Sequence, residues 1–212
     1  MLYPVMLNIA GKKAVVVGGG PVAARKARSL IEAGALVEVI SPEIAEAMEE
    51  LLNDHNIRWR KKEFTPADLT DAFIVMAATN SQETNELIQR SASSYQLVNR
   101  VDDSKESSFI VPASFKKDQL CVAVSTHGAS PALSKRIIQE LKEQFDDSYI
   151  SYVTFLDECR AAVKRLCSDP SGRQMTLKKL ASPAFEKKVK EASPAERKQL
   201  LTDIVRDWRE KQ

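Results

Sequence analysis

Short apolar runs and longer amphipathic stretches alternate along the first half of the chain. Between Lys12 and about Val101, runs of β-branched and aliphatic residues are separated by stretches in which apolar residues recur every three to four positions. The runs predict strands and the stretches predict helices. Because helical stretches separate the strands, the pattern predicts an α/β fold: a Rossmann-like parallel sheet covered by helices on both faces.

The boundaries of these elements follow from the apolar pattern and its turn residues. Strands are predicted at 13–17, 36–40, 57–60, 73–78 and 97–101. The third strand alternates apolar and charged residues, which is typical of an edge strand. Helices are predicted at 21–33 and 44–52, a short helix opens at Thr65-Pro66, and Asn80-x-x-Glu83 predicts the start of another.

Beyond about residue 107 the pattern changes. Residues 108–114 and 120–125 predict two strands whose connection, 115–119, is too short for a helical crossover and therefore makes a hairpin. Ser130-Pro131 begins a predicted helix that ends near Phe145. From residue 149 only helical patterns remain, at 152–166 and after the Ser-Pro pairs at 182–183 and 193–194, with a turn at 169–172.

The patterns predict three parts, an α/β domain at 1–112, a hairpin and helix at 113–148, and a small all-helical domain at 149–212. The hairpin and helix present an apolar face larger than the remaining chain can cover. Uncovered apolar faces favour association, so we expect a homodimer formed through 113–148.

Composition narrows the class of protein. The apolar fraction of 43% is ordinary for a globular chain, and no apolar run approaches the roughly 20 residues of a membrane helix. The N-terminal residues lack the pattern of a secretory signal. Three cysteines without a CxxC pair, and only two histidines, predict reduced thiols in the cytoplasm and no metal site.

Charge is unevenly distributed, although the net charge is only +2. Residues 149–212 hold 14 Lys and Arg against 9 Asp and Glu. Such a basic segment can face an anionic substrate or a nucleic acid, or it can simply be solvated helix surface. Acidic residues are interleaved with the basic ones, so we expect no nucleic-acid partner.

The turn after the first predicted strand carries the pattern G-x-G-x-x-A. In this position Gly18 permits the tight turn, Gly20 lets a pyrophosphate approach the backbone, and Ala23 lets the helix pack on the strand. The helix N-terminus adds free N–H groups and a positive dipole end. Strand, spacing and helix together predict that 1–112 binds a dinucleotide at Gly18, Gly19, Gly20, Pro21 and Val22.

The end of the second predicted strand indicates which dinucleotide the chain binds. An acidic residue about 20 positions beyond the glycines usually binds the ribose of NAD. Here the strand ends in Ser41-Pro42-Glu43, and no Lys or Arg that could hold a 2′-phosphate occurs between Ser41 and Leu52. We therefore expect NAD rather than NADP, with Ser41, Pro42 and Glu43 near its ribose.

Polar residues also follow the fourth and fifth strands. Thr79 and Asn80 could bond the cofactor, and Asn80 could equally cap the next helix. The fifth strand leads to Asp102 and Asp103 at the same sheet edge. A carboxylate there could accept the proton that a dehydrogenation releases, although Asp102 taken alone could equally be a capping residue.

A polar loop at 125–131 precedes the helix predicted from Pro131. A helix N-terminus of this kind can bind a carboxylate, and we expect His127 to contact a substrate there. A loop histidine taken alone is usually only exposed to solvent.

A set of short segments runs through the chain. They are YPVML at 3–7, VVVGGGPVA at 15–23, RKA at 25–27, EAGA at 32–35, AATN at 77–80, NRVD at 99–102, SSFIVP at 107–112 and VAVSTHGASP at 122–131. Together they resemble the precorrin-2 dehydrogenase family of sirohaem synthesis, which includes the N-terminal part of bifunctional sirohaem synthases. The resemblance is close over roughly 1–145 and only architectural in the helical tail.

The resemblance implies an oxidoreductase that oxidises precorrin-2 to sirohydrochlorin with NAD, in sirohaem (porphyrin) biosynthesis. It puts the family's important aspartate at Asp102, and its cofactor contacts at the glycine turn with Pro21 and Val22 and at Pro42 and Glu43. It implies a homodimer in which the hairpin and the following helix exchange contacts between subunits. A polycarboxylate tetrapyrrole would give the basic C-terminal third a ligand to face.

The chain departs from the bifunctional synthases at two positions. Thr126 and His127 stand where those proteins carry a serine, phosphorylated in some, and a glycine, so the resemblance does not carry over regulation by serine phosphorylation. We expect no methyltransferase half. Two alternatives stay open, a bifunctional dehydrogenase and sirohydrochlorin ferrochelatase, and a non-catalytic NAD-sensing regulatory domain that would need neither Asp102 nor the basic tail.

Overall fold

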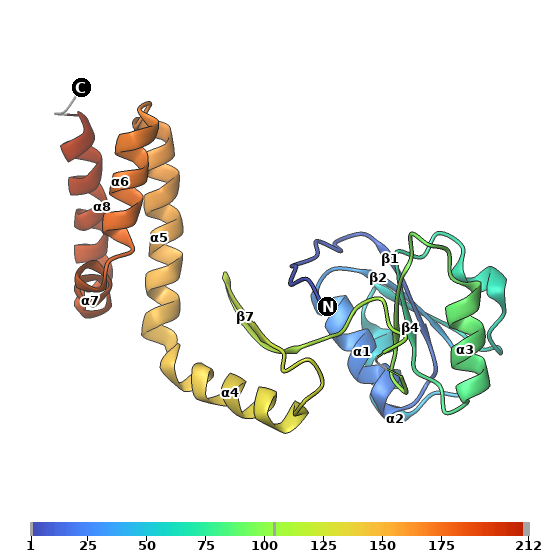
Figure 1. Ribbon diagram of the computed structural model, residues 1–212. Coiled ribbons are helices and arrows are strands. Elements are labelled where there is room, and N and C mark those ends of the chain that lie inside the picture. Colours follow the sequence, from blue (N-terminus) through green and yellow to red (C-terminus); the bar gives the residue numbers. More distant parts are fainter. Residues whose placement is uncertain (1, 104, 210–212) are drawn as a thin grey trace. The chain divides into compact units, whose positions relative to one another are not determined.

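The chain folds into two compact units, residues 1–111 and 112–212 (Figure 1). The computed structural model describes residues 2–103 and 105–209. The border between the units lies beside the boundary predicted at residue 112. The further division at 148, which separates the expected dimerisation region from the helical domain, stays a prediction.

The first unit is built on a five-stranded parallel sheet in the order β3-β2-β1-β4-β5. The strands are β1 (Lys13–Val17), β2 (Leu36–Ile40), β3 (Ile57–Arg60), β4 (Ile74–Ala77) and β5 (Leu97–Arg100). The four valine and alanine positions of β1 after Lys13 are buried, because both faces of the central strand are covered. From β1 the chain proceeds outward to β2 and β3, then returns to β4 on the other side. Such a switch point leaves a crevice at the carboxyl ends of the strands.

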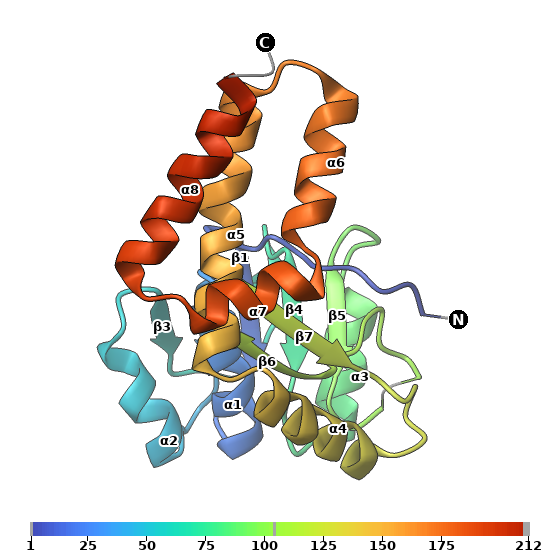
Figure 2. The same ribbon diagram turned by 90° about the vertical axis from the view of Figure 1, so that its left-hand side faces the viewer.

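Helices cover both faces of this sheet, so the predicted Rossmann-like fold is confirmed (Figures 1 and 2). On one face lie α1 (Pro21–Glu32), α2 (Glu46–Glu49) and the 3₁₀ helix η1 (Glu50–Asn53). On the other lie α3 (Gln82–Ser91) and the 3₁₀ helix η2 (Pro66–Leu69). The pleat of β1 sends Val16 into the first core and Val15 into the second.

Two helix starts differ from the sequence prediction. The helix expected at 44–52 begins only at Glu46, because the N–H of Ala45 donates to the carbonyl of Gly19 at 2.8 Å and holds the chain extended before it. The cap of α3 is Ser81, whose Oγ accepts the N–H of Thr84 at 3.1 Å. Asn80, predicted as the possible cap, is therefore not used for this purpose.

The hairpin of the second unit is displaced from its predicted position. Its strands are β6 (Ala113–Lys117) and β7 (Leu120–Val124), with Lys117 paired to Leu120. Asp118, with φ of 48°, occupies the tight turn between them. The predicted strand at 108–114 is wrong in its first part, because Ser108 hydrogen-bonds to Val98 of β5 instead.

The rest of the second unit is helical, with α4 (Pro131–Gln144), α5 (Asp147–Leu166), α6 (Pro170–Leu180), α7 (Pro183–Glu191) and α8 (Pro194–Arg209). The Ser-Pro starts of α4, α7 and α8 are confirmed. The turn predicted at 169–172 is wrong. Asp169 caps α6 by accepting the N–H groups of Ser171 and Gly172, so the same turn-forming residues begin a helix.

Aromatic rings join the hairpin to the helices of the second unit. Phe115 of β6, Phe145, Tyr149 and Tyr152 make successive ring contacts at 6.4, 4.7 and 5.9 Å between centroids. The buried side of α5 then continues through Phe155 into a core shared with α6, α7 and α8. Within the described ranges, no helix has the length and apolarity needed to cross a membrane.

Candidate functional site

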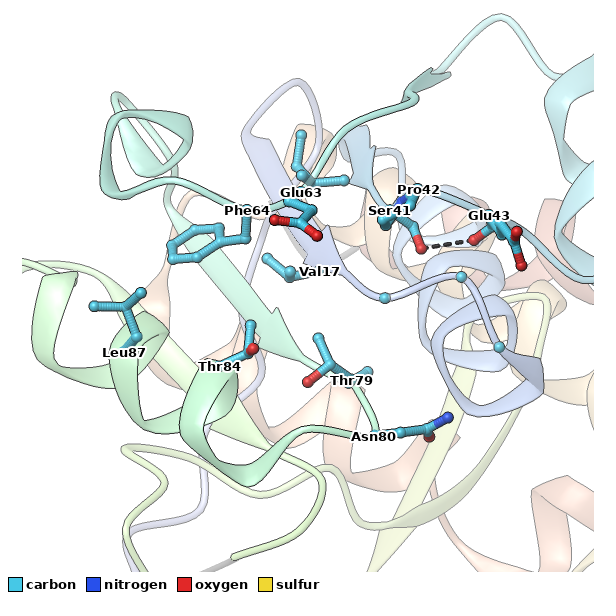
Figure 3. A pocket seen from close by; sticks show the side chains of 15 residues that line it. Val17, Ser41, Pro42, Glu43, Glu63, Phe64, Thr79, Asn80, Thr84 and Leu87 are labelled. Atoms are coloured by element: carbon cyan, nitrogen blue, oxygen red, sulfur yellow. Dashed lines mark hydrogen bonds between the residues drawn. The ribbon is translucent and has the colours of Figure 1, made fainter.

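A cavity of about 540 Å³ lies at the carboxyl ends of β1, β2 and β4, where the switch point predicts a ligand (Figure 3). Its walls come from the glycine turn, the loop after β2, the chain before η2, the end of β4 and the first turns of α3. The lining residues are Val17, Gly18, Gly19, Gly20, Ile40, Ser41, Pro42, Glu43, Glu63, Phe64, Ala78, Thr79, Asn80, Thr84 and Leu87.

The three glycines of the turn differ in the space around their Cα atoms. Gly18 has φ of 122°, and a Cβ there would collide with the carbonyl of Ala78. A Cβ on Gly19 would collide with the carbonyl of Glu43. A Cβ on Gly20 would meet nothing within 4 Å. The first two glycines therefore serve the fold, whereas the space beside Gly20 is open for a ligand.

The N-terminus of α1 is free to bind an anion. Gly20 is its N-cap and provides no side-chain hydrogen bond, while Ala23 is fully buried against the sheet. Unpaired N–H groups and the helix dipole favour a negative group at this point. Pro21 and Val22 lie exposed beside the turn, and neither lines the cavity.

Ser41, Pro42 and Glu43 form the loop after β2, as predicted, but they differ in exposure. Ser41 is buried and its Oγ donates to the carbonyl of Glu43 at 2.6 Å. The indole Nε1 of Trp59 donates to the carbonyl of Ser41 at 2.9 Å. The Ser41 hydroxyl therefore shapes the loop, and Pro42 and Glu43 are exposed on the cavity wall.

Among the lining residues that the sequence analysis did not assign to the site are Glu63, Phe64, Thr84 and Leu87. Figure 3 shows the carboxylate of Glu63 directed into the cavity and the side chains of Phe64 and Leu87 at the end away from Glu43. Thr84 and Leu87 are three positions apart on α3 and thus share a face. That spacing could have identified them once α3 was known to follow a strand of the cavity.

Two basic residues near the end of β3, Arg60 and Lys62, are paired with carboxylates of the first unit. Arg60 Nη1 donates to Glu38 at 3.2 Å and to Asp68 at 3.0 Å. Lys62 Nζ donates to both carboxylate oxygens of Asp68, at 3.0 and 2.9 Å. Neither side chain lines the cavity, in contrast to the carboxylates of Glu43 and Glu63.

Thr79 and Asn80 form the cavity wall after β4. Thr79 is held by Asn85 of α3, because both its N–H and its Oγ1 donate to the Asn85 Oδ1, at 3.3 and 2.8 Å. Asn80 is exposed and points its amide toward the glycine turn in Figure 3. The Thr79 side chain is thus fixed, and Asn80 has an exposed amide on the cavity wall.

Asp102 lies just beyond the end of β5, paired to a buried arginine. Arg100 donates to it twice, from Nε at 3.3 Å and from Nη2 at 2.9 Å. The Arg100 side chain is 6% exposed and that of Asp102 is 28% exposed. Hydrogen bonding from Arg100 lowers the pKa of Asp102 more than partial burial raises it, and Asn85 contributes a smaller lowering. Asp103 instead accepts the N–H of Lys105 at 2.9 Å and shapes the loop.

His127 and Thr126 belong to the second unit, on the turn before α4. His127 is exposed and has φ of 52°, in the left-handed region. The Thr126 Oγ1 accepts the N–H of Ser130 at 3.1 Å and lies 3.2 Å from the Ser134 Oγ. The Thr126 hydroxyl therefore supports the start of α4.

Comparison with known proteins places the chain in a family. The family described as "Putative NAD(P)-binding" matches residues 5–113, and the "SirC C-terminal domain" matches 149–191. The precorrin-2 dehydrogenase of Priestia megaterium is 34% identical over 184 residues, which are 87% of this chain and 91% of the relative. The chain belongs to the precorrin-2 dehydrogenase family. Its NAD(P)-binding part holds the cavity described above.

Other relatives agree with this assignment. The Bacillus subtilis precorrin-2 dehydrogenase is 31% identical and matches 75% of this chain and 98% of its own length. A solved structure described as "SirC, precorrin-2 dehydrogenase" superposes with a TM-score of 0.81 at 31% identity, over 97% of this chain and all of that one. The siroheme synthase 3 of Aeromonas hydrophila subsp. hydrophila is 32% identical over 96% of this chain, which spans only 44% of the synthase.

Proposed function

We propose that this protein is an NAD-dependent precorrin-2 dehydrogenase that forms sirohydrochlorin in sirohaem biosynthesis. In this reaction precorrin-2 loses a hydride to NAD and a proton to a base, so that sirohydrochlorin, NADH and a proton result. The observation that carries the proposal is the match to precorrin-2 dehydrogenases along nearly their whole length. The cavity at the glycine turn supports it, because its shape and lining suit a dinucleotide.

The residues around the cavity fit NAD. Its pyrophosphate suits the open space beside Gly20 and the free N–H groups of α1. Its adenosine ribose suits Pro42 and Glu43 on the cavity wall. The nicotinamide side would then lie toward Asn80. When bound, the nicotinamide supplies the hydride acceptor.

The charge of the cavity favours NAD over NADP. Glu43 and Glu63 line it, whereas Arg60 and Lys62 are paired with Glu38 and Asp68. A 2′-phosphate would therefore meet two carboxylates and no free cation among the lining residues. Repulsion between like charges in a partly enclosed site opposes its binding.

Asp102 is the residue that we assign to proton transfer. Its lowered pKa keeps it deprotonated at neutral pH, which a proton acceptor requires. The same lowering weakens it as a base. The assignment therefore implies that substrate binding loosens the Arg100 hydrogen bonds before the proton is transferred. We assign His127 to a contact with a substrate carboxylate.

We further propose a cytoplasmic homodimer. Three free cysteines, of which Cys159 and Cys167 are buried, suit a reducing compartment. The hairpin of β6 and β7 is a two-stranded sheet, which is marginal by itself and would gain cover from a second copy. Static light scattering at micromolar concentration tests the dimer, and a monomer there would refute it.

The test of the activity is incubation of the purified protein with precorrin-2 and NAD, with sirohydrochlorin and NADH followed by absorbance. We expect stoichiometric formation of both. Added Fe²⁺ distinguishes the dehydrogenase from an enzyme that also inserts iron, because only the latter converts sirohydrochlorin to sirohaem. NAD binding without any turnover would instead indicate a sensing domain.

A further inference from the structure

The side chain of Arg100 is a buried cation at the end of β5. Only 6% of it is exposed, although its neighbour across the sheet, Ala77 of β4, belongs to an apolar core. Burying a guanidinium costs free energy, and a buried ion pair is often no more stabilising than apolar residues of similar volume. The stability of the first unit is therefore a weak reason for a cation at this position.

Arg100 makes a two-point contact with Asp102. Its Nε donates to Oδ1 at 3.3 Å and its Nη2 donates to Oδ2 at 2.9 Å. Two bonds from a planar guanidinium fix the plane of a carboxylate, which a single contact from an ammonium does not do. A carboxylate has about four lone-pair positions, so each oxygen of Asp102 keeps part of its accepting capacity for a proton.

The ion pair is open to solvent on the carboxylate side. The side chain of Asp102 is 28% exposed, whereas that of Arg100 is 6% exposed. A ligand that approaches the pair therefore meets the carboxylate before the guanidinium. Asp102 follows β5, which pairs with β4, the strand that leads to the cavity wall at Thr79. The pair thus presents an oriented proton acceptor at the sheet edge that also forms the cavity.

A hydroxyl further along the chain holds the backbone on both sides of Asp102. The Oγ of Ser107 accepts the N–H of Arg100 at 2.8 Å. The same Oγ lies 3.3 Å from the carbonyl oxygen of Arg100 and 3.1 Å from that of Asp103, to which it can donate its hydrogen. Ser107 therefore closes the turn that carries Asp102, and the two-point contact does not depend on a free loop.

We propose that Arg100 is a positioning residue that holds the carboxylate of Asp102 ionised and in one orientation, ready to accept the proton of the substrate. The direction of the Asp102 pKa agrees, since the Arg100 hydrogen bond is the largest cause of its lowering. The other charged groups that act on Arg100 are Asp103 on the same loop and Glu86 of α3. This inference rests on the proposed function for its meaning, but not for its measurement.

The test is the titration midpoint of the Asp102 carboxyl, measured by carbon NMR of the full chain and assigned with Asp102→Asn. Arg100→Leu removes a positive charge and two hydrogen bonds, all of which lower a carboxyl pKa, so we expect the midpoint to rise by about one pH unit or more. The acid limb of kcat/KM, which reports the free enzyme, should rise with it. An unchanged midpoint would overturn the proposal. If Arg100→Leu does not fold, the neutral donor in Arg100→Gln should give a smaller rise.

The matched control is Arg90→Leu, the same change at an arginine of the first unit that lies on α3. Arg90 is exposed and pairs with Glu86 at 3.4 Å. Its removal takes away one cation and leaves both hydrogen bonds of Asp102 in place, so we expect the midpoint of the wild type. A rise as large as that in Arg100→Leu would indicate a general effect of charge and would overturn the assignment to Arg100.

Arg100→Lys separates orientation from charge. Lysine keeps the positive charge but offers a point contact in place of the planar fork. We expect a midpoint closer to the wild type than in Arg100→Leu, unchanged NAD affinity by calorimetry, and a kcat lower by about tenfold or more, because the acceptor is no longer aligned. A wild-type kcat would overturn the orienting role. If the wild type binds NAD and yet fails to oxidise precorrin-2, the proposed function fails, while the comparison of midpoints remains interpretable.

Discussion

Arg100 binds both carboxylate oxygens of Asp102, with its Nε 3.3 Å from Oδ1 and its Nη2 2.9 Å from Oδ2. One residue separates the two, so this ion pair ties the end of β5 to the chain that follows it. A buried guanidinium needs such a partner, because an unpaired buried charge is strongly destabilising. Any variant of Asp102 must therefore be judged by stability as well as by activity.

The first prediction is that Asp102→Asn removes most of the dehydrogenase activity and leaves NAD binding intact. The amide oxygen still accepts one Arg100 hydrogen bond, but it cannot take a proton. A positioned general base contributes ~10²–10⁴ in rate, so kcat should fall by that factor. A residue with only a capping role would cost about 0.5–2 kcal/mol of stability and leave kcat nearly unchanged. Measuring kcat and the melting temperature on the same variant distinguishes these cases.

Asp103→Asn is the control for that experiment. Asp103 accepts the N–H of Lys105 and holds only its own loop. We expect a near-normal kcat. An essential Asp103 together with a dispensable Asp102 would refute our assignment of the base even if the reaction is right.

The second prediction separates two neighbouring glycines. Gly19→Ala should lower the stability of the first unit, because its Cβ collides with the carbonyl of Glu43, a backbone atom. Gly20→Val should leave the melting temperature nearly unchanged and abolish NAD binding, because the space beside Gly20 is open. Thermal unfolding and calorimetric titration with NAD measure the two effects. Normal NAD affinity in Gly20→Val would show that the pyrophosphate lies elsewhere.

The third prediction concerns the choice of cofactor. The wild type should show a kcat/KM for NAD at least about tenfold above that for NADP, which corresponds to about 1.4 kcal/mol of transition-state binding. Glu63→Lys should narrow the ratio, since it replaces a carboxylate that lines the cavity with a cation. Glu106→Lys, outside the cavity lining, is the control for a general change of charge. Equal kcat/KM for both cofactors in the wild type would contradict this interpretation.

The fourth prediction concerns the pH dependence of stability. Asp68 is buried, and although burial alone raises its pKa, hydrogen bonds from Lys62 and Thr65 outweigh that effect and lower it. A depressed folded-state pKa stabilises the protein above the unfolded pKa of about 3.9, and the stabilisation disappears as the pH falls through the folded value. Asp68→Asn should therefore lower the free energy of unfolding by about 3 kcal/mol at pH 7.

The difference between wild type and Asp68→Asn should shrink steadily below about pH 4 in urea unfolding experiments. Glu63→Gln, an exposed carboxyl on the same stretch of chain, should show no comparable loss at pH 7. A constant difference from pH 7 to pH 2 would mean that Asp68 acts through packing and not through its charge.

The sequence predicted the strands of the first unit well, because the central strands are short and mostly apolar and the edge strand β3 alternates apolar and charged residues. β1, β2 and β3 begin and end at the predicted residues. The sequence predicted the hairpin less well. Ser108 and Phe109 lie in a segment with a strand-like pattern, but they hydrogen-bond to β5 at the sheet edge. Local pattern does not distinguish a strand of a hairpin from a segment that pairs with a distant strand.

For the candidate site, the sequence identified the residues that directly follow strands, since the fold brings those ends together. The sequence did not indicate Glu63, Phe64, Thr84 or Leu87. These residues belong to segments that lie beside the cavity only because of tertiary packing. The sequence also did not indicate that Arg100 pairs with Asp102. The partner of an arginine within a buried strand depends on the tertiary structure, which the local pattern does not show. The hydrogen bonds by which Asn85 holds Thr79 likewise depend on the packing of α3 against β4.

The segment after β5 affects the tendency of this protein to aggregate at high concentration. Ser107 and Ser108 accept the N–H groups of Arg100 and Val98 through their hydroxyl oxygens, at 2.8 and 2.7 Å. The outer edge of β5 is therefore already satisfied and cannot recruit a strand from a neighbouring molecule. At the opposite edge, β3 carries Arg58 and Arg60, and charged side chains on an edge strand disfavour pairing with a strand of another molecule. Both edges of the sheet therefore disfavour the addition of a strand from another molecule, which is the step that leads to fibrils.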